Sequence, residues 1–150
     1  MKINSKTCLI YSPGGHYTEL KKSLKGIHFK NKYHVTFKSG TIVKNNIYYI
    51  THPQKKIIRT IKNLFDSLKI LIREKPKIII STGADVALNT IILGKLFFNS
   101  KIIFIESSAN ITKPSLTGRI SYYFSDLFIA QWQQMRKFYP KAKISQGFLH

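Results

Sequence analysis

Short apolar runs recur along this chain, and longer segments with helical patterning separate them. The clearest run, Lys77-Ile78-Ile79-Ile80-Ser81, is apolar almost throughout, as expected for a strand whose sheet is covered on both faces. The longest separating segment, 55–75, repeats its apolar residues every three or four positions, which is the spacing of one helical face. Because strands alternate with helices, we predict an open, mainly parallel α/β sheet with helices on both faces.

The length of 150 residues suits a single domain, so we treat 1–150 as one unit. Within it, β-branched, aromatic and continuous apolar runs predict the strands, and three-four spacing with proline boundaries predicts the helices. The expected strands are 7–11, 33–37, 47–50, 77–81, 101–105, 126–130 and 143–145, and the expected helices are 19–24, 55–75, 86–98, 114–124 and 131–138.

The helix predicted over 55–75 has an apolar stripe and a basic side. We expect the stripe to pack against the core, and the basic side either to be solvated or to face an anionic membrane. Pro76 would end the helix. The stripe consists of Ile57, Ile61, Leu64, Phe65, Leu68, Leu71 and Ile72, and the basic residues are Lys55, Lys56, Arg59, Lys62, Lys69 and Arg73.

The charge of the chain is extreme, with 25 basic residues against six acids and a formal net charge of +19. Such a surface favours polyanionic partners: nucleic acid, an anionic bilayer or phosphorylated substrates. No stretch reaches the roughly 18–20 apolar residues of a membrane span, so we expect any membrane association to be peripheral. The single cysteine, Cys8, lies in an apolar run, where a small core residue is expected.

A glycine pair follows the first long apolar run. The order strand, Gly14-Gly15 and helix is typical of a phosphate-binding corner, because glycine lets the backbone approach a ligand and the helix start favours an anion. His16 is placed to donate to that anion or to accept a proton. A plain tight turn with a solvated histidine explains the same residues.

Two more predicted strands end in small or polar residues, Ser81-Thr82-Gly83-Ala84 and Glu106-Ser107-Ser108. Ligands of open parallel sheets bind beyond the carboxyl ends of the strands, so these segments and the glycine corner would together form a cleft suited to a phosphate or diphosphate. Taken singly, Thr82 could be a helix N-cap and Gly83 could simply relieve the backbone.

Several common sites are absent from the sequence. The dinucleotide fingerprint, the Walker pattern and the hydrolase elbow do not occur. The five histidines are scattered and the cysteine is alone, so no metal site is expected. We therefore predict no cofactor and no metal.

An ordered set of motifs over nearly the whole chain resembles the acceptor-side subunit of split GT-B glycosyltransferases. That family includes the PssD/CpsF-type enhancer subunits of bacterial capsule and exopolysaccharide synthesis. It also includes the eukaryotic subunit that anchors the second N-acetylglucosamine transferase of dolichol-linked oligosaccharide synthesis. The matching pieces are Gly14-Gly15-His16-Tyr17-Thr18-Glu19-Leu20, Ser81-Thr82-Gly83-Ala84, Ile105-Glu106-Ser107, Pro114-Ser115-Leu116-Thr117-Gly118-Arg119, Ala130-Gln131-Trp132 and Tyr139-Pro140.

The resemblance implies a Rossmann-like domain that forms the N-terminal half of a GT-B fold. A separate donor-binding subunit would supply the C-terminal half, and the two chains together would transfer a sugar from a UDP-sugar to a lipid-diphosphate-linked saccharide acceptor. The product would be a capsular or exopolysaccharide repeat unit. The chain would be cytoplasmic and peripheral on the inner face of the cell membrane, held at its anionic surface, and would show glycosyltransferase activity only as a complex with the donor-binding subunit.

The resemblance also assigns candidate site residues. Gly14, Gly15 and His16 would face the acceptor diphosphate, and His16 is the candidate catalytic base. Glu19 would orient His16 or its loop, or would only compensate the helix dipole. Glu106 would bond a sugar hydroxyl or the partner, or would be a strand-end acid paired to a lysine. Ser107 would join Glu106 in binding the acceptor. Asn110 stands where the family commonly has an arginine, so no fixed cation is expected there. The remaining assignments are Thr82 and Gly83 as cleft lining, and Ser115, Thr117, Arg119 and Trp132 as loop-ordering or partner-contacting residues.

Two other functions fit parts of the sequence. The charge alone would suit a nucleic-acid-binding α/β protein, although the basic residues are spread out and no recognised nucleic-acid module is present, so no nucleic acid is expected as a partner. A self-sufficient small α/β enzyme is the other alternative, against which stand the missing nucleotide site and the missing acid pair.

Overall fold

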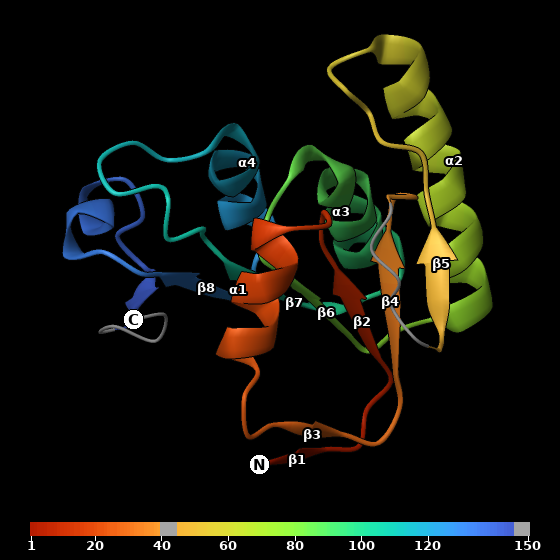
Figure 1. Ribbon diagram of the computed structural model, residues 1–150, viewed down its shortest axis with the longest axis horizontal. Coiled ribbons are helices and arrows are strands. Elements are labelled where there is room, and N and C mark those ends of the chain that lie inside the picture. The colour runs from red at the N-terminus through yellow and green to blue at the C-terminus, as the bar shows by residue number, and fades with distance from the viewer. Residues whose placement is uncertain (40–44, 146–150) are drawn as a thin grey trace.

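A seven-stranded sheet, parallel throughout, organises the structure (Figure 1). The computed structural model describes residues 1–39 and 45–145. The strand order is β5-β4-β2-β6-β7-β8-β9, so the chain moves outward from β2 in one direction and then returns to continue in the other. The bounds are β2 Thr7–Ile10, β4 Lys32–Thr36, β5 Ile47–Tyr49, β6 Ile78–Ser81, β7 Lys101–Ile105, β8 Leu127–Ala130 and β9 Lys143–Ile144.

This reversal creates a topological switch point between β2 and β6. The two strands pair in parallel with Thr7 opposite Ile78 and Ile10 opposite Ser81. The connections that follow β2 and β6 therefore leave the same edge of the sheet side by side. In open α/β sheets a crevice at this place binds ligands.

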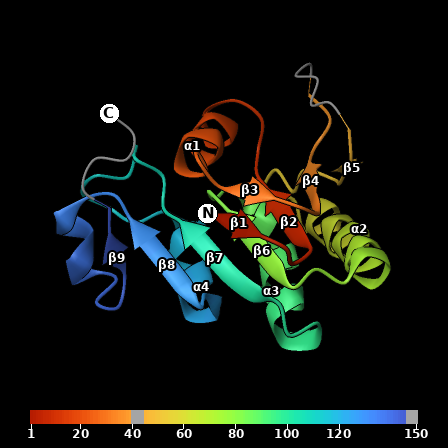
Figure 2. The same cartoon turned by 90° about the horizontal axis from the view of Figure 1, so that it is seen from below.

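Helices cover both faces of the sheet, as predicted, but unequally. Three helices lie on one face, while the short helix α1 lies on the other (Figure 2). The bounds are α1 Gly15–Ser23, α2 Ile57–Glu74, α3 Leu88–Phe97 and α4 Leu116–Phe124, with 3₁₀ turns η1 at Asp85–Ala87 and η2 at Gln133–Lys137. The sequence placed the start of α1 too late and expected an ordinary helix where η2 forms.

Alternate residues of the central strands enter two separate cores. Cys8 and Ile10 pack with the three-helix layer, whereas Leu9 and Tyr11 pack beneath α1 with Leu20. This is the period-two alternation of a strand with both faces covered. Burial raises the pKa of the Cys8 thiol to about 12, so Cys8 is an unreactive core residue, as expected.

A two-stranded parallel ribbon, which the sequence did not predict, lies beside α1. It pairs β1 (Lys2–Ile3) with β3 (His28–Phe29), and the terminal amine of Met1 donates to the carbonyl of Gly26 at 3.1 Å. Strands of two residues carry too short a pattern to be recognised in a sequence. Their pairing comes from contacts between segments that lie far apart in the chain.

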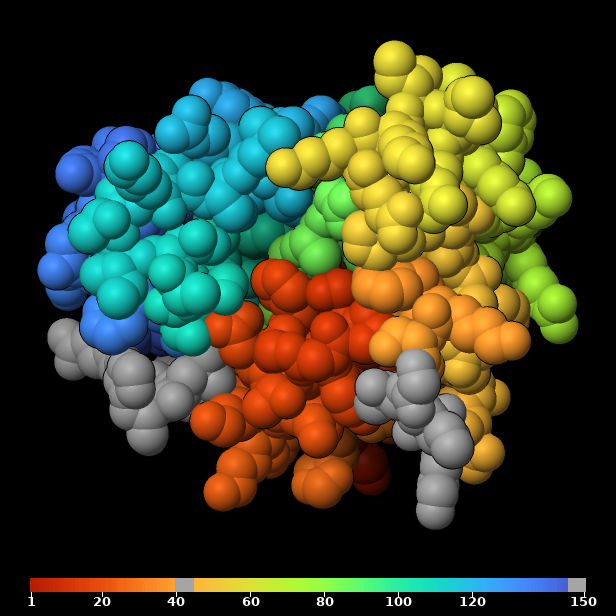
Figure 3. All heavy atoms as spheres, turned by 45° about the horizontal axis from the view of Figure 1, so that its top comes forward, coloured from red at the N-terminus to blue at the C-terminus, as the bar shows by residue number. Residues whose placement is uncertain are grey.

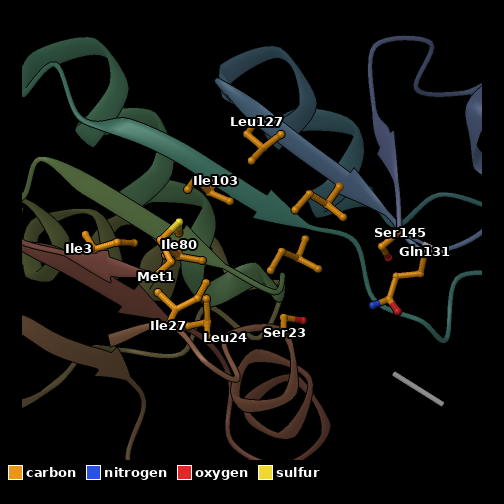
Figure 4. A pocket seen from close by; sticks show the side chains of 12 residues that line it. Met1, Ile3, Ser23, Leu24, Ile27, Ile80, Ile103, Leu127, Gln131 and Ser145 are labelled. Carbon is orange, nitrogen blue, oxygen red and sulfur yellow. The ribbon is translucent and has the colours of Figure 1, made fainter. Parts of the chain in front are cut away.

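The sheet face beside α1 is only partly covered. A groove of about 210 Å³ remains between α1, the amino-terminal ribbon and strands β6 to β8 (Figure 4). Leu24 and Ile27 form one wall, and Ile80, Ile103 and Leu127 form the floor. The groove is apolar because one short helix cannot cover the face of so many strands.

Helix α2 differs from the prediction in which face it buries. Its buried residues are Asn63, Ser67, Ile70 and Leu71, and most of the predicted apolar stripe points outward. Asn63 Nδ2 donates to the carbonyls of Thr51 and Val86, at 2.7 and 3.3 Å. Thr90 Oγ1 of α3 donates to Ser67 Oγ at 2.9 Å. These buried hydrogen bonds fix the rotation of α2 about its axis, so the prediction that the stripe packs against the core was wrong.

In the part of the chain that the structure describes, no helix is both long enough and apolar enough to cross a bilayer.

Candidate functional site at the switch point

The glycine corner opens the site at the end of β2. Gly14 has φ 89° and ψ −128°, a conformation that side chains rarely adopt. Helix α1 begins at Gly15, and among the described residues no side chain caps it and no atom lies within 4 Å of a Cβ built on Gly15. The first amides of α1 are therefore uncapped by side chains and open to an approaching group. Such an end of a helix favours an anion.

His16 is clamped to the loop that follows β6. Its Nδ1 lies 2.8 Å from the carbonyl oxygen of Thr82, and Thr82 Oγ1 donates to the carbonyl oxygen of His16 at 2.7 Å. A carbonyl can only accept, so Nδ1 must carry the proton. In the neutral ring Nε2 is then the unprotonated nitrogen, which is the form that a general base requires.

Gly83 allows the β6 loop to lie against this imidazole. Its φ is 106°, and a Cβ at this position would lie 3.4 Å from His16 Cε1. A larger residue would be strained by its backbone conformation and would press on the ring. Gly83 therefore has a local reason to be glycine beyond the relief of the backbone.

Glu19 joins α1 to the end of β7. Its Oε1 accepts hydrogen bonds from Ser107 Oγ at 3.0 Å, from the Ser108 amide at 2.9 Å and from Ser108 Oγ at 2.6 Å. Its Oε2 lies 3.8 Å from His16 Nδ1 and is buried with no hydrogen bond to any residue that the structure describes. The three strand ends singled out in the sequence therefore do meet, with α1 bridging them.

Glu106 is placed differently from the expectation that it would bond a sugar or a partner. Its side chain is only 2% exposed. Oε1 accepts from Asn110 Nδ2 and Ser115 Oγ, each at 2.8 Å, and Oε2 accepts from the Tyr139 hydroxyl at 2.8 Å. Because both oxygens are occupied by groups of the same chain, Glu106 orders the surrounding loops from the inside.

Gly118 lets α4 pack directly over this carboxylate. A Cβ at position 118 would lie 1.9 Å from Glu106 Oε2 and 2.7 Å from the Tyr139 hydroxyl. Burial and the hydrogen bond to Glu106 raise the pKa of Tyr139, so its hydroxyl remains a donor. The motif containing Gly118 therefore shapes the contact between α4 and β7.

The other candidate residues occupy varied positions. Ser115 caps α4, since its Oγ accepts from the Gly118 amide at 2.8 Å. Trp132 Nε1 donates to the carbonyl of Ser108 at 2.7 Å, which holds the loop that carries Ser107. Arg119 is exposed on α4, and Thr117 is half-buried there. Ser115 and Trp132 thus hold loops beside the site, while Arg119 and Thr117 make no side-chain hydrogen bond within residues 1–39 and 45–145.

Sequence reasoning missed a histidine–aspartate pair beside the site. His52 follows β5 and Asp85 follows β6, and their side chains approach to 3.7 Å between Nε2 and Oδ1. His52 also packs edge-on against Phe37 at 4.2 Å between ring centroids. The position of His52 just beyond a strand end was the available signal. Figure 3 shows the surface hollowed between α1, the segment that leads into α2, and α4, with the residues after β6 at its floor.

Comparison with known proteins places this chain in a family. The model of the family described as "Oligosaccharide biosynthesis protein Alg14 like" matches residues 50–149. The UDP-N-acetylglucosamine transferase subunit ALG14 of Kluyveromyces lactis is 31% identical over 136 residues, which cover 78% of this chain and 58% of that protein. The human subunit of the same name is 28% identical over 91 residues, covering 57% and 42% of the two chains. The chain thus spans less than two thirds of the curated relatives that it matches.

Solved structures support the fold assignment. MurG of Acinetobacter baumannii superposes with a TM-score of 0.63 at 14% identity, over 84% of this chain and 41% of that one. MnaA of Staphylococcus aureus superposes with a TM-score of 0.67 at 12% identity, over 95% and 43%. The fold is thus Rossmann-like, as predicted, and corresponds to the N-terminal domain of GT-B proteins. With two thirds of its residues matched by the family model, this chain belongs to the Alg14-like family of oligosaccharide biosynthesis proteins.

Proposed function

We propose that this protein is the acceptor-side subunit of a two-chain glycosyltransferase that uses a UDP-sugar. The observation that carries the proposal is the clamp between His16 and Thr82, at the switch point of a chain whose relatives are named as UDP-N-acetylglucosamine transferase subunits. These names favour N-acetylglucosamine as the transferred sugar. They give no support to the nucleic-acid-binding alternative.

The acceptor would be a lipid-diphosphate-linked saccharide. Its diphosphate would lie against the amides at Gly14 and Gly15, where α1 begins without a side-chain cap and no side chain of the glycines intervenes. Thr82 and Gly83 would line the same cleft from the β6 side, and Ser107 from the β7 side. If Gly14 and Gly15 formed only a plain turn, the meeting of the polar ends of β2, β6 and β7 at one edge of the sheet would have no explanation.

His16 would act on the acceptor hydroxyl. With Nδ1 bound to the Thr82 carbonyl, Nε2 of the neutral ring has no proton and would accept the one that the hydroxyl loses. The hydroxyl oxygen would bond to the anomeric carbon of the UDP-sugar as the bond from that carbon to UDP breaks and UDP leaves. The side chain is 31% exposed, so a substrate can reach it. Glu19 would be a positioning residue, because it ties α1 to the loop of Ser107 and Ser108. Glu106 would position the site through Asn110, Ser115 and Tyr139.

The UDP-sugar would bind mainly to a second subunit that forms the C-terminal GT-B half. The absence of a nucleotide fingerprint from the sequence supports this division, as does the word "subunit" in the names of the relatives. Arg119 and Thr117 on α4 are candidates for contact with that subunit. A capsular or exopolysaccharide product remains a prediction, because the curated relatives do not carry such names. Attachment would be peripheral, on the cytoplasmic face of the cell membrane.

The test is a reconstituted transfer assay. The chain, its donor-binding subunit and a lipid-diphosphate-linked saccharide are incubated with UDP-N-acetylglucosamine, and the elongated saccharide is measured. We expect transfer from the complex and essentially none from this chain alone. A normal rate without the second subunit would contradict the split-enzyme proposal, and equal rates with other UDP-sugars would contradict the choice of N-acetylglucosamine.

A further inference from the structure

The exposed side of α2 is apolar where a soluble helix is normally polar. Ile57 is 80% exposed, Ile58 83%, Ile61 50% and Phe65 56%, and Leu64 is also exposed. These residues recur every three or four positions, so they form one continuous stripe along the first half of the helix. Contiguous exposed apolar surface of this kind marks an interaction site. We call this stripe the outer face of α2.

The opposite side of the helix explains why the apolar residues point outward. The inward face carries Asn63, which donates to the carbonyls of Thr51 and Val86, and Ser67, whose hydroxyl accepts from Thr90. Turning the helix to bury its apolar stripe would break these bonds and leave buried polar groups without partners, which costs free energy for each group. The hydrogen bonds on the inward face of α2 therefore keep the outer face exposed to solvent.

Basic side chains flank the outer face, and acidic ones are absent from it. Lys62, Lys69 and Arg73 follow one another at helical spacing along one flank, and all three are exposed. The two acids of the helix are engaged by other groups of the chain: Asp66, between Lys62 and Lys69 on that flank, is half-buried, and Glu74 also lies 3.8 Å from Arg73 Nε. Asp66 accepts from the amide and the hydroxyl of Thr51 at 2.9 and 2.7 Å, and Glu74 pairs with Lys6 at 2.6 Å. Lys55, Lys56 and Arg59 add exposed positive charge at the start of the helix.

The outer face also lies at the edge of the molecule that carries the candidate site. Helix α2 begins beyond the carboxyl ends of the strands, and its first turns project past the sheet (Figure 1). Hydrogen bonds from Thr51 to Asp66 and from Asn63 to Thr51 brace the projecting segment. In Figure 3 this segment borders the hollow whose floor follows β6. A surface that touched the outer face would therefore lie close to the opening of the site.

We propose that the outer face of α2 lies on an anionic lipid bilayer, with its isoleucines and Phe65 in the headgroup region and its lysines and arginines on lipid phosphates. An apolar stripe flanked by basic residues is the pattern of helices that lie in a membrane interface. The inference deepens the peripheral attachment proposed above and rests on it. It adds the surface that makes the contact and an orientation in which the site opens toward a lipid-linked acceptor.

The charge complementarity is what favours a bilayer over a protein partner. A protein interface at this face would need a matching cluster of acids, whereas an anionic bilayer offers negative charge over its whole surface. A second exposed apolar pair, Leu96 and Phe97, lies at the far end of α3, before β7 begins. That pair is at the amino edge of the sheet, away from the site, and serves as a control.

The experiment measures binding of the purified full chain to vesicles by flotation. Vesicles of phosphatidylcholine are compared with vesicles containing 30% phosphatidylglycerol by composition, at low and physiological salt. We expect binding only to the anionic vesicles, with weakening as salt rises. The double variants Ile58→Ser/Phe65→Ser and Lys62→Ser/Lys69→Ser should each bind roughly tenfold more weakly.

Matched controls distinguish a specific effect of the outer face of α2 from a general loss of apolar area or of positive charge. Leu96→Ser/Phe97→Ser removes a similar apolar area, and Lys25→Ser/Lys30→Ser removes the same charge at exposed positions away from α2. Both controls should bind anionic vesicles nearly as the parent does. All substituted side chains are exposed, and thermal unfolding verifies that each variant is folded.

Each contrary outcome overturns the inference. Parental binding by both α2 variants would exclude the outer face, and loss with the Leu96/Phe97 control alone would move the contact to α3. Equal binding to neutral and anionic vesicles would exclude a contribution from attraction between the basic side chains and anionic lipids. No vesicle binding, together with loss of the donor-binding subunit from the α2 variants, would make the face a protein interface. The proposed transferase activity is judged separately with a water-soluble acceptor in detergent, which requires no membrane.

Discussion

His16 and Thr82 hold each other by two reciprocal hydrogen bonds, although 66 positions separate them in the sequence. The imidazole Nδ1 donates to the Thr82 carbonyl at 2.8 Å, and the Thr82 hydroxyl donates to the His16 carbonyl at 2.7 Å. The pair locks the start of α1 to the end of β6 across the switch point. It also fixes the tautomer of His16. In the neutral ring Nε2 has no proton and can accept one from a substrate.

Replacing His16 tests the proposed base. We expect His16→Ala to lower the rate of sugar transfer by the complex by about 100-fold or more, because a positioned general base contributes a factor of that order. The chain should remain folded, since the side chain is partly exposed. His28→Ala, at an exposed position of the amino edge, is the matched control and should keep parental activity. Parental activity in His16→Ala would refute the assignment.

Thr82 tests whether the clamp matters for the site. Thr82→Val removes the hydroxyl and its bond to the His16 carbonyl, so we expect a loss of about 1 kcal/mol in the free energy of unfolding. The rate of transfer should fall as well, because α1 loses part of its fixed position. Thr82→Ser keeps the hydroxyl and should restore both quantities. If the Thr82→Val and Thr82→Ser variants behave alike in denaturant unfolding and in the transfer assay, the Thr82 hydroxyl does not help to hold α1 in place.

Substitution of Gly15 distinguishes an effect on stability from an effect on acceptor binding. A Cβ at Gly15 meets no atom within 4 Å, and alanine favours a helix over glycine, so Gly15→Ala should stabilise the fold by about 0.5–1 kcal/mol. If the acceptor diphosphate approaches the backbone there, the same substitution should raise the KM for the acceptor. The two readouts are thermal unfolding and acceptor titration. An unchanged KM would argue that the diphosphate lies elsewhere.

Gly118 is expected to respond in the opposite sense. A Cβ at this position would lie 1.9 Å from Glu106 Oε2, so Gly118→Ala must push α4 away from β7. We expect it to destabilise the fold by roughly 2–3 kcal/mol, in the range of overpacked cores. Denaturant unfolding measures the loss, with Gly15→Ala as the glycine-to-alanine control. A parental midpoint would mean that Glu106 can turn away at little cost.

Asp126 gives the fold a defined dependence on pH. Burial acts to raise the pKa of its carboxyl, but the hydrogen bonds from Lys95 Nζ and from the Ile102 amide outweigh it and lower the pKa below the usual value of 3.8. The carboxylate therefore stabilises the folded state above about pH 4, and this contribution disappears as the pH falls through the lowered pKa.

The variant Asp126→Asn isolates this effect. We expect its melting temperature to lie below that of the parent at pH 6–7 and to approach it as the pH is lowered toward 3. The comparison cancels the general acid sensitivity of so basic a chain, because both proteins share it. A gap that stays constant with pH would show that the charge of Asp126 contributes little.

The sequence by itself determined the order of the seven strands of the main sheet and of the four α-helices, and it predicted a candidate site at three strand ends. Continuous apolar runs such as Ile78–Ser81 identify strands buried on both faces, and Gly14-Gly15 after a strand marks a corner open to an anion. These signals are local: they depend on spacing and on backbone freedom within a few residues. They do not require knowledge of which segments meet in the folded chain.

Only the tertiary structure decided which groups face each other. Periodicity shows that α2 has an apolar stripe, but the hydrogen bonds of Asn63 and Ser67 with distant segments decide that the stripe faces outward. Glu106 looked available at a strand end, and it is buried because Ser115 and Tyr139 fold back onto it. Contacts of this kind join residues far apart in the chain, and the free energy that selects them is absent from any local pattern.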